Sequence, residues 1–225
     1  MKNFIDSKIF NYSLSKSTKE PKILNDLNRE THLKILNPRM LSGHYQGRIL
    51  SLVSKIIKPK TVLEIGTYTG YSTICLSEGL DKNGSIHTID HNEELLVIQN
   101  KYFKKAGISE KVKQYTGDAT KVVKKLNLDF DLVFIDADKE NYPLYFDSII
   151  EKVKPGGVIV ADNILWSGKI LEKVEEEDYA TKSIIEFNDK VNNDDRVETI
   201  ILPIRDGLSL IRKFKYPLIN PTFYK

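Results

Sequence analysis

The stretch that most constrains the fold of this chain is TVLEIGTYTGYS, residues 61–72. Its apolar run, Val62 to Ile65, stops at Gly66, and a second glycine, Gly70, precedes a segment compatible with a helix. A strand, a glycine turn and a helix start in this order are typical of the first unit of a doubly wound α/β sheet, whose turn contacts a ligand. We therefore predict a mostly parallel sheet with helices on both faces.

The spacing within this turn indicates which ligand it takes. In the dinucleotide fingerprint G-x-G-x-x-G, the middle glycine lets the backbone approach a pyrophosphate. Tyr68 stands at that place here, and its ring would meet the pyrophosphate. A nucleoside without phosphates suits the turn better, and Glu64 at the strand end can accept hydrogen bonds from its ammonium or hydroxyl groups. S-adenosylmethionine is such a ligand; the alternative is an ordinary turn that binds nothing, because short glycine motifs also occur by chance.

Composition and charge limit the partners of the chain. Its 34 lysines and arginines against 31 aspartates and glutamates leave a net charge of +3, and the lysines form no stripe, so no nucleic-acid partner is predicted. The single cysteine, Cys75, excludes an internal disulfide and favours a reducing compartment. No targeting segment or membrane span is recognisable. We expect a cytoplasmic protein without a membrane partner.

The 225 residues fit one domain. We divide it into a helical extension over 1–42, a core over 43–213 and a tail over 214–225. The last two apolar runs, 197–204 and 208–211, are joined by a turn too short for a parallel crossover, so they must be antiparallel neighbours. The prediction is a Rossmann-like sheet of seven strands, mostly parallel, with an antiparallel strand in a C-terminal hairpin.

Three further expectations concern single helices. Ser17 or Thr18 is expected to cap a helix with Pro21 in its first turn. The following helix is expected to have an apolar face made of Tyr45, Ile49, Leu52, Val53 and Ile56. A Pro-Gly-Gly sequence, residues 155–157, is expected to break the helix before the fifth strand.

Acidic residues stand where the second and third strands end. An acid about 20 residues after the glycine turn is where a ribose diol is held in this fold class, and Asp90 has a similar spacing. Asp118 lies beyond the third strand, on the same sheet edge, where it can accept a hydrogen bond from an adenine amino group. Asp90 could instead be a plain strand-end aspartate.

A second group of polar residues ends the fourth and fifth strands. Asp136 follows one strand, and Asp162 and Asn163 follow its expected neighbour. Two carboxylates and an amide carbonyl suit Mg²⁺, Mn²⁺ or Ca²⁺ and leave positions open for a substrate with two adjacent oxygens. Lys139 could take a phenol proton or stabilise the phenolate. The alternatives are that the acids only cap loops or helices and that the lysine is a solvated surface residue.

Four motifs occur in a fixed order along the chain. They are LEIGTYTGYS (63–72), FIDADK (134–139) with Asn141 and Tyr142, GGVIVADN (156–163) with Trp166-Ser-Gly168, and LPIRDGLS (202–209). In these motifs the chain resembles the cation-dependent class I O-methyltransferases, the group that contains catechol O-methyltransferase and the caffeoyl-coenzyme A O-methyltransferases. The resemblance runs from about Met40 to Lys213.

The resemblance implies methyl transfer from S-adenosylmethionine to a hydroxyl of a catechol-like or caffeoyl-type small aromatic diol. It implies a divalent cation, Mg²⁺ before Mn²⁺ or Ca²⁺, held by Asp136, Asp162 and Asn163, with Lys139 and Asp136 as catalytic residues. The implied cofactor site consists of Met40, Ser42, Glu64, Gly66, Tyr68, Ser72, Asp90, Asp118, Ala119 and Asp136. It also implies a homodimer in which the N-terminal segment helps to form the acceptor pocket.

Other readings of the residues lead to different functions. A methyltransferase could act on RNA or on a substrate that needs no metal, although the oxygen-ligand trio and the absence of a basic stripe argue against both. A nicotinamide-dependent oxidoreductase would need a turn that admits a pyrophosphate, which Tyr68 disfavours. A binding protein without enzymatic activity is the remaining alternative.

Overall fold

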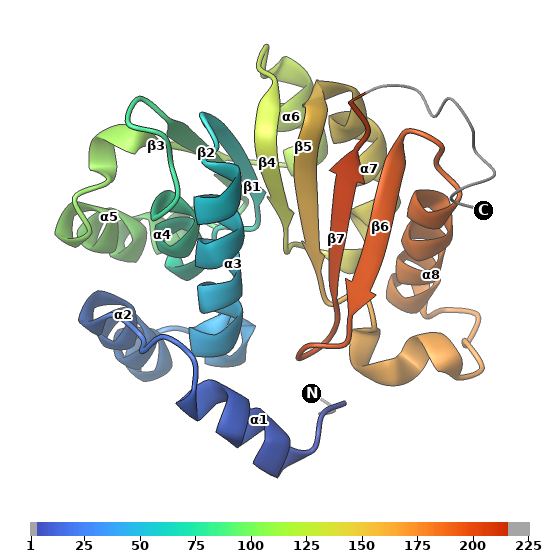
Figure 1. Ribbon diagram of the computed structural model, residues 1–225, viewed down its shortest axis with the longest axis horizontal. Helices are drawn as coiled ribbons and strands as arrows, with labels where there is room; N and C mark the ends of the chain where they lie inside the picture. The colour runs from blue at the N-terminus through green and yellow to red at the C-terminus, as the bar shows by residue number, and fades with distance from the viewer. Residues whose placement is uncertain (1–3, 216–225) are drawn as a thin grey trace.

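The computed structural model describes residues 4–215, and the strands of this part form one seven-stranded sheet in the order β3-β2-β1-β4-β5-β7-β6 (Figure 1). The strands are β1 Thr61–Ile65, β2 Ser85–Asp90, β3 Val112–Thr116, β4 Phe130–Ile135, β5 Val153–Asp162, β6 Val197–Leu202 and β7 Leu208–Lys213. The pairs among β1 to β5 are parallel, and β7 is antiparallel to both β5 and β6. The predicted Rossmann-like sheet with its C-terminal hairpin is therefore confirmed.

Helices cover both faces of the sheet (Figure 1). They are α1 Ser7–Ser15, α2 Lys22–Lys34, α3 Gly43–Ile57, α4 Tyr71–Ser77, α5 Leu96–Lys105, α6 Ala119–Lys125, α7 Tyr142–Ile149 and α8 Tyr179–Asn192, with short 3₁₀ helices η1 Pro38–Met40, η2 Glu93–Leu95, η3 Ser109–Lys111, η4 Lys139–Asn141, η5 Ile150–Lys152 and η6 Trp166–Leu171. Helices α2 to α5 pack in one hydrophobic core and α6 to α8 in the other. None of the helices in the described part is long and apolar enough to cross a membrane.

The central strand β4 explains why the sheet has two cores. Successive side chains of a strand point to opposite faces. Leu132 and Phe134 accordingly lie in the core of α2 to α5, whereas Val133 and Ile135 lie in the core of α6 to α8. All four are fully buried, as expected for a parallel strand that is covered on both faces.

Strands β1 and β4 are neighbours at the point where the strand order reverses. Ligands of open α/β sheets bind at this switch point, beyond the carboxyl ends of the strands. Helices α1 and α2 and the turn between β6 and β7 lie toward this end of the sheet (Figure 1). The fold thus places the N-terminal helices beside the predicted site.

The start of α2 differs from the prediction. Neither Ser17 nor Thr18 caps it; Pro21 is the N-cap residue, and no side chain accepts a hydrogen bond from the first turn. A separate helix, α1, precedes it, and Asp6 caps that helix by accepting from the backbone N–H groups of Lys8 and Ile9 at 2.9 and 3.2 Å. A side-chain N-cap is thus present at α1 but not at α2.

The apolar face predicted for α3 is only partly buried, with Ile49 and Val53 packed against the core of α2 to α5. The buried residues of α3 are Gln46, Gly47, Leu50, Ser51 and Ser54, whereas Leu52 and Ile56 are 60% and 73% exposed. The reason is close packing against α4: a Cβ atom at Gly47 would lie 2.7 Å from the Tyr71 ring and 2.8 Å from Cys75 Sγ. Small residues therefore face the neighbouring helix, and part of the apolar face is left exposed.

The Pro-Gly-Gly sequence does not break a helix, because it lies inside β5. Helix α7 already ends at Ile149. Phe130 of β4 pairs with Val153, but Leu132 pairs with Val158, so the extra residues of β5 form an irregularity in the ladder. Proline and glycine are tolerated in a strand at such bulges. The division into extension, core and tail stays a prediction, and the tail beyond residue 215 lies outside the described residues.

Candidate active site

The glycine turn brings the ends of β1 and β4 into close contact. Gly66 has φ +99°, and a Cβ atom built on it would lie 1.9 Å from the carbonyl oxygen of Asp136. The backbone N–H of Asp136 donates to the carbonyl of Ile65 at 2.8 Å. Any larger residue at position 66 would push the two strand ends apart, so the turn and Asp136 form one rigid unit.

Asp90 lies directly beside this turn, as predicted. Its carboxylate accepts hydrogen bonds from the backbone N–H of Tyr68 at 2.7 Å and from that of Asn92 at 2.9 Å. Tyr68 has φ +49°, a conformation in which a bulky residue is unusual. The bond to Asp90 helps to hold Tyr68 in this conformation.

Tyr68 also joins the turn to the N-terminal extension. Its hydroxyl donates to the carbonyls of Leu36 and Asn37 at 3.1 and 3.3 Å. The following residues include Met40, which is 61% exposed, and Ser42, which is buried. The structure thus brings the segment with these two predicted cofactor residues to the glycine turn.

Glu64 is a fully buried carboxylate at the end of β1. Its Oε2 accepts from the hydroxyls of Thr73 at 2.5 Å and Thr88 at 2.6 Å, whereas Oε1 has no partner among the described residues. Burial raises the pKa of Glu64 to about 7, although the nearby hydroxyls of Ser72, Thr73 and Thr88 act in the opposite direction. An unpaired buried oxygen is uncommon in proteins, and this one can accept a hydrogen bond from a ligand.

Ser72, Ala119 and Asp118 occupy helix starts around the same edge. Ser72 is buried in the first turn of α4, and Ala119 is the buried first residue of α6. Asp118 caps α6 by accepting from the backbone N–H and hydroxyl of Thr120 at 2.9 and 2.6 Å. The hydroxyl bond of Thr120 is the main reason that the pKa of Asp118 is lowered. The cap therefore engages one oxygen of the carboxylate that we predicted to contact adenine.

Lys139 and Asp136 form an ion pair beside the end of β4. The Lys139 Nζ atom lies 3.2 Å from Asp136 Oδ1 and donates to the Tyr142 hydroxyl at 2.9 Å. The lysine side chain is only 10% exposed, so it is not a solvated surface lysine. Tyr142 in turn donates to the carbonyl of Asp162 at 2.8 Å. One buried tyrosine therefore links Lys139, which is paired with Asp136, to the backbone of Asp162.

Asp162 ends β5 next to Asp136, because Ile135 pairs with Ala161 in the adjacent strands. Its Oδ2 accepts from Gln46 Nε2 at 2.7 Å, and its Oδ1 accepts from the backbone N–H of Asn163 at 2.8 Å. Burial and the nearby Asp136 carboxylate raise the pKa of Asp162. A bound cation would relieve the repulsion between two such carboxylates, so the donor set fits a divalent ion.

Within residues 4–215, no group of three or more histidine, cysteine, aspartate and glutamate side chains is arranged to hold a metal ion. The predicted trio contains two carboxylates, and its third donor is the amide of Asn163. That amide donates from Nδ2 to Asp206 Oδ2 at 3.4 Å. Asp136, Asp162 and Asn163 stay the predicted ligands.

The loop after β5 has an unusual backbone. Asn163, Trp166 and Ser167 all have positive φ angles, between +44° and +61°. Asp206 holds this loop: it is 3% exposed, its carboxylate accepts from the Ser167 backbone N–H, and its carbonyl accepts from the Leu165 backbone N–H at 3.0 Å. Strain of this kind persists where the surroundings enforce it, often at functional sites.

Three residues near the site had no predicted role: Gln46, Arg205 and Asp206. The last two belong to the motif 202–209 quoted above, which is the signal that could have identified them. Gln46 had no such signal, because it is not part of the apolar face predicted for its helix. Its contact with Asp162 joins residues 116 positions apart.

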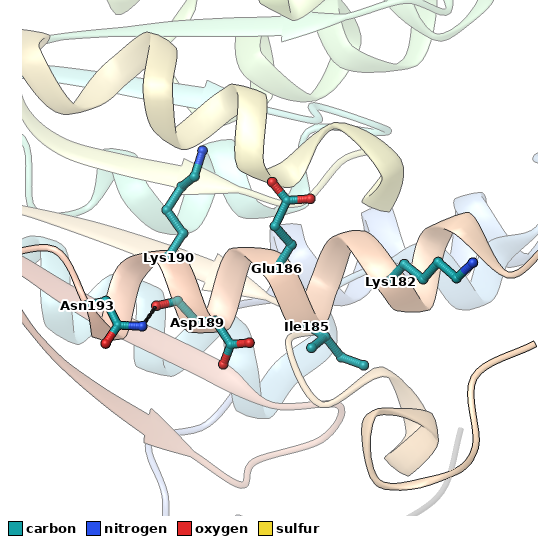
Figure 2. A pocket seen from close by; sticks show the side chains of 6 residues that line it. All are labelled: Lys182, Ile185, Glu186, Asp189, Lys190 and Asn193. Carbon is teal, nitrogen blue, oxygen red and sulfur yellow. Dashed lines mark hydrogen bonds between the residues drawn. The ribbon is translucent and has the colours of Figure 1, made fainter. Parts of the chain in front are cut away.

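A surface depression of about 500 Å³ lies elsewhere, on α8. It is lined by Lys182, Ile185, Glu186, Asp189, Lys190 and Asn193, and Figure 2 shows these side chains spread along the helix. Lys190 forms an ion pair with Asp147 of α7 at 2.7 Å. None of the predicted site residues lines this depression, so it is separate from the candidate active site.

Residues 14–214 match the model of a family described as O-methyltransferase. The chain belongs to the O-methyltransferase family. Among its relatives, the caffeoyl-CoA O-methyltransferase of Petroselinum crispum is 34% identical over 91% of this chain and 90% of the relative. Caffeoyl-CoA O-methyltransferase 5 of Nicotiana tabacum is 33% identical, again over 91% of this chain and 90% of the relative.

Solved structures of O-methyltransferases have the same fold with bound cofactor. The O-methyltransferase from Bacillus cereus in complex with S-adenosylhomocysteine (SAH) has a TM-score of 0.81 and 27% identity, covering 92% of this chain and 97% of that one. TomG from Streptomyces achromogenes, in complex with S-adenosylmethionine, has a TM-score of 0.83 and 25% identity, covering 92% and 96%. The chain is a SAM-dependent O-methyltransferase, which removes the alternatives of an oxidoreductase and of a protein without enzymatic activity.

Proposed function

We propose that this O-methyltransferase needs a divalent cation and methylates a hydroxyl of a catechol-like or caffeoyl-type aromatic diol. The observation that carries the proposal is the pair of carboxylates, Asp136 and Asp162, at adjacent strand ends with the buried Lys139 beside them. The relatives named as caffeoyl-CoA O-methyltransferases, which align with most of the chain, support the same acceptor class. A small acceptor also agrees with the scattered lysines, which do not favour nucleic acid.

Asp136, Asp162 and Asn163 would hold the cation. Their oxygen donors suit Mg²⁺, Mn²⁺ and Ca²⁺ alike, and the preference for Mg²⁺ rests on the family resemblance. When bound, the cation supplies Lewis-acid stabilisation of the phenolate and fixes its orientation. Three protein donors leave coordination positions for the two oxygens of a diol. Gln46 and the Asn163 backbone hold the Asp162 carboxylate in place before any ion arrives.

Lys139 would act on the proton of the acceptor. A phenol with a pKa of about 10 is a poor nucleophile at neutral pH. The amine of Lys139 is held by Asp136 and by the Tyr142 hydroxyl, so it is positioned either to accept the proton or to stabilise the anion. The remaining contribution is alignment of oxygen, methyl carbon and sulfur for in-line displacement, which is a proximity effect.

The cofactor would lie along the glycine turn. Asp90 would hold the ribose diol, and the unpaired Oε1 of the buried Glu64 offers an acceptor for a cofactor hydroxyl or ammonium group. Ser72, Ala119 and Asp118 would complete the site on one side, and Met40 and Ser42 on the other. The contacts of Tyr68 with residues 36 and 37 support a site enclosed by the N-terminal segment.

We also propose that the enzyme is a homodimer. The apolar residues Leu52 and Ile56 of α3 and Ile200 and Ile201 of β6 are between 41% and 73% exposed. A groove of about 370 Å³ runs between these elements and β7. Exposed apolar surface next to an edge strand favours association, and a second copy of the chain is the proposed occupant. The cytoplasm stays the proposed location, in agreement with the free, buried thiol of Cys75.

Transfer of labelled methyl from S-adenosylmethionine to a panel of catechols, including a caffeoyl thioester, tests the proposal. We expect transfer with Mg²⁺ and loss of transfer with excess chelator. If transfer continues at the same rate in chelator, the metal requirement is wrong and the acceptor class that needs no metal takes its place. If SAH binds but no catechol is methylated, the acceptor proposal fails while the family assignment is unaffected.

A further inference from the structure

An arginine in the turn between β6 and β7 has a backbone conformation that favours glycine. Arg205 has φ +53°, in the left-handed region that residues with a Cβ atom seldom adopt. Such a conformation persists only where the surroundings stabilise it. The contacts of the arginine side chain show what stabilises it here.

The guanidinium of Arg205 contacts two segments near the other end of the chain. Its Nη1 donates to Gln46 Oε1 at 2.7 Å, and its Nη2 donates to the carbonyl of Leu41 at 3.3 Å. Gln46 is 2% exposed and lies in α3. Leu41 directly follows Met40 in the segment before α3. The hairpin turn therefore holds the end of the N-terminal extension.

Gln46 extends this contact to Asp162. Its Nε2 donates to Asp162 Oδ2 at 2.7 Å. Since a guanidinium only donates hydrogen bonds and a carboxylate only accepts them, the orientation of the amide follows from its two partners. Glutamate at this position would lack the donor for Asp162, and leucine would make neither bond. The amide of glutamine can thus both accept a hydrogen bond from the arginine and donate one to the aspartate.

The turn itself is fastened to the loop after β5. The carbonyls of Asp206 and Gly207 accept from the backbone N–H groups of Leu165 and Ile164 at 3.0 and 3.3 Å. A Cβ atom at Gly207 would lie 2.4 Å from the Leu165 side chain, so the two loops are in close contact. The hairpin turn that carries Arg205 is therefore held in place by the loop after β5, so the Arg205 side chain can position the residues that it contacts.

We propose that Arg205 and Gln46 are positioning residues, which together form a brace between residues 38–42 and Asp162. The brace holds the segment of Met40 and Ser42 closed over the cofactor site and sets the orientation of the Asp162 carboxylate. The role of its Asp162 end, the contact between Gln46 and Asp162, rests on the proposed metal function. The role of its Leu41 end, the contact between Arg205 and Leu41, does not. The two ends can therefore be tested separately.

Two variants interrupt the brace at different points, Arg205→Gly at Leu41 and Gln46, and Gln46→Leu at Asp162. Arg205→Gly removes the guanidinium and places the residue that prefers positive φ in the turn, so a purely local role of Arg205 predicts unchanged or higher thermal stability. In Gln46→Leu, the new side chain has a similar size but can form neither the hydrogen bond with Arg205 nor that with Asp162. Arg212→Ala is the matched control, because Arg212 belongs to the same hairpin and its guanidinium pairs with Glu198 instead of with Leu41 or Gln46. Arg212 also lines the groove of the proposed dimer, so the variants are compared at the same oligomeric state. Arg205→Lys keeps the charge but not the two-pronged geometry, and replaces the glycine variant if that one fails to fold.

The Leu41 end is measured by trypsin cleavage after Arg39 and by SAH affinity in the absence of metal. We expect Arg205→Gly to speed cleavage after Arg39 and to weaken SAH binding, each by about tenfold, as for the loss of hydrogen bonds to a charged group. Arg212→Ala should leave both unchanged. Wild-type cleavage and affinity in Arg205→Gly, or faster cleavage at all sites together with a lower melting temperature, would overturn the brace.

The Asp162 end is measured by titration with Mn²⁺ alone. We expect Gln46→Leu to weaken Mn²⁺ binding by about tenfold, a common effect of losing a residue that orients a metal ligand, with little change in cleavage after Arg39. Unchanged Mn²⁺ affinity in this variant would remove Gln46 from the proposal. If the wild-type protein binds no Mn²⁺, the metal function itself fails, and the cleavage assay still decides the Leu41 end.

Discussion

At the scale of single residues, the site contains buried polar groups that would destabilise the folded state if they had no hydrogen-bond partners. Asp162 is buried beside another carboxylate, and its oxygens are held by Gln46 and by the Asn163 backbone. Glu64 is fully buried with one oxygen unpaired. Such arrangements are stable only when surrounding donors or a ligand compensate for the lost hydration. They therefore mark where cation and cofactor are expected to bind.

The first prediction concerns Asp162. Replacing it by alanine should lower metal-stimulated methyl transfer by about 100-fold or more, because removal of a ligand should exceed the effects known for residues that only orient ligands. SAH affinity should change little, since Asp162 is not among the predicted cofactor residues. Radiolabel transfer with Mg²⁺ and calorimetric titration with SAH measure the two effects. Asp147→Ala, an exposed acid on α7, is the control, and full metal-dependent activity in Asp162→Ala would show that the metal assignment is wrong.

At the scale of elements, close approach between helices decides which face of α3 is buried. Gly47 allows contact with α4, and Ser54 donates from its hydroxyl to the Leu76 carbonyl at 2.6 Å. Arg48 and Lys55 pair with Glu78 at the end of α4 at 2.6 and 2.7 Å. Small and polar residues thus make the interface between these two helices.

The second prediction follows from this interface. Gly47→Ala should destabilise the protein by about 1–3 kcal/mol, because the added methyl group overfills the contact with Tyr71 and Cys75. Urea unfolding of the variant against wild type measures the change. The same substitution at Gly43 is a poor control, because Gly43 has φ +73°. Val97→Ala, at a 79% exposed position of α5, serves instead, and equal effects of both variants would contradict the packing argument.

At the scale of the whole molecule, the proposed dimer depends on exposed apolar surface, and the expected acid stability depends on the partly buried carboxylate of Glu78. The exposed residues of α3 and β6 lie on either side of the groove described above. Glu78 joins α3 to α4 by accepting hydrogen bonds from Arg48, Ser51 and Lys55. Each of these features leads to a measurement on the intact enzyme.

The third prediction concerns assembly. Ile56→Glu should convert the proposed dimer into a monomer, because it places a charge in an apolar contact. The melting temperature of the monomer fold should be little changed, since Ile56 is 73% exposed. Light scattering after size-exclusion chromatography measures the mass. Val97→Glu, at a similarly exposed position on α5, should keep the wild-type mass; a monomeric wild-type protein would refute the dimer.

The fourth prediction concerns acid stability. Burial acts to raise the pKa of Glu78, but hydrogen bonds from Arg48, Lys55 and Ser51 outweigh it and lower the pKa to about 2. Because the folded-state pKa lies below the unfolded value of about 4.3, this stabilisation is complete above the unfolded value and is lost as the pH falls toward about 2. The free energy of unfolding of Glu78→Gln should therefore fall less between pH 5 and 3 than that of wild type. Parallel urea curves at each pH provide the measurement, and equal losses in both proteins would contradict it.

Local sequence determined the features that depend on neighbouring residues. The apolar runs and glycine turn specified the strands and the switch point, and the short turn before Leu208 required an antiparallel hairpin. Strand-end acids could be assigned to one edge because parallel strands end on the same side. Asp136, Asp162 and Asp90 were placed there for that reason, and the structure brings each to its expected strand end.

Only the tertiary structure decided what depends on distant residues. The buried face of α3 follows from how closely α4 can approach, which an apolar pattern within α3 does not reveal. The brace joins Arg205 to Gln46 across 159 positions and Gln46 to Asp162 across 116, and no local pattern specifies such partners. Hydrophobic periodicity determines which residues avoid water, whereas packing and hydrogen-bond geometry determine which of them meet.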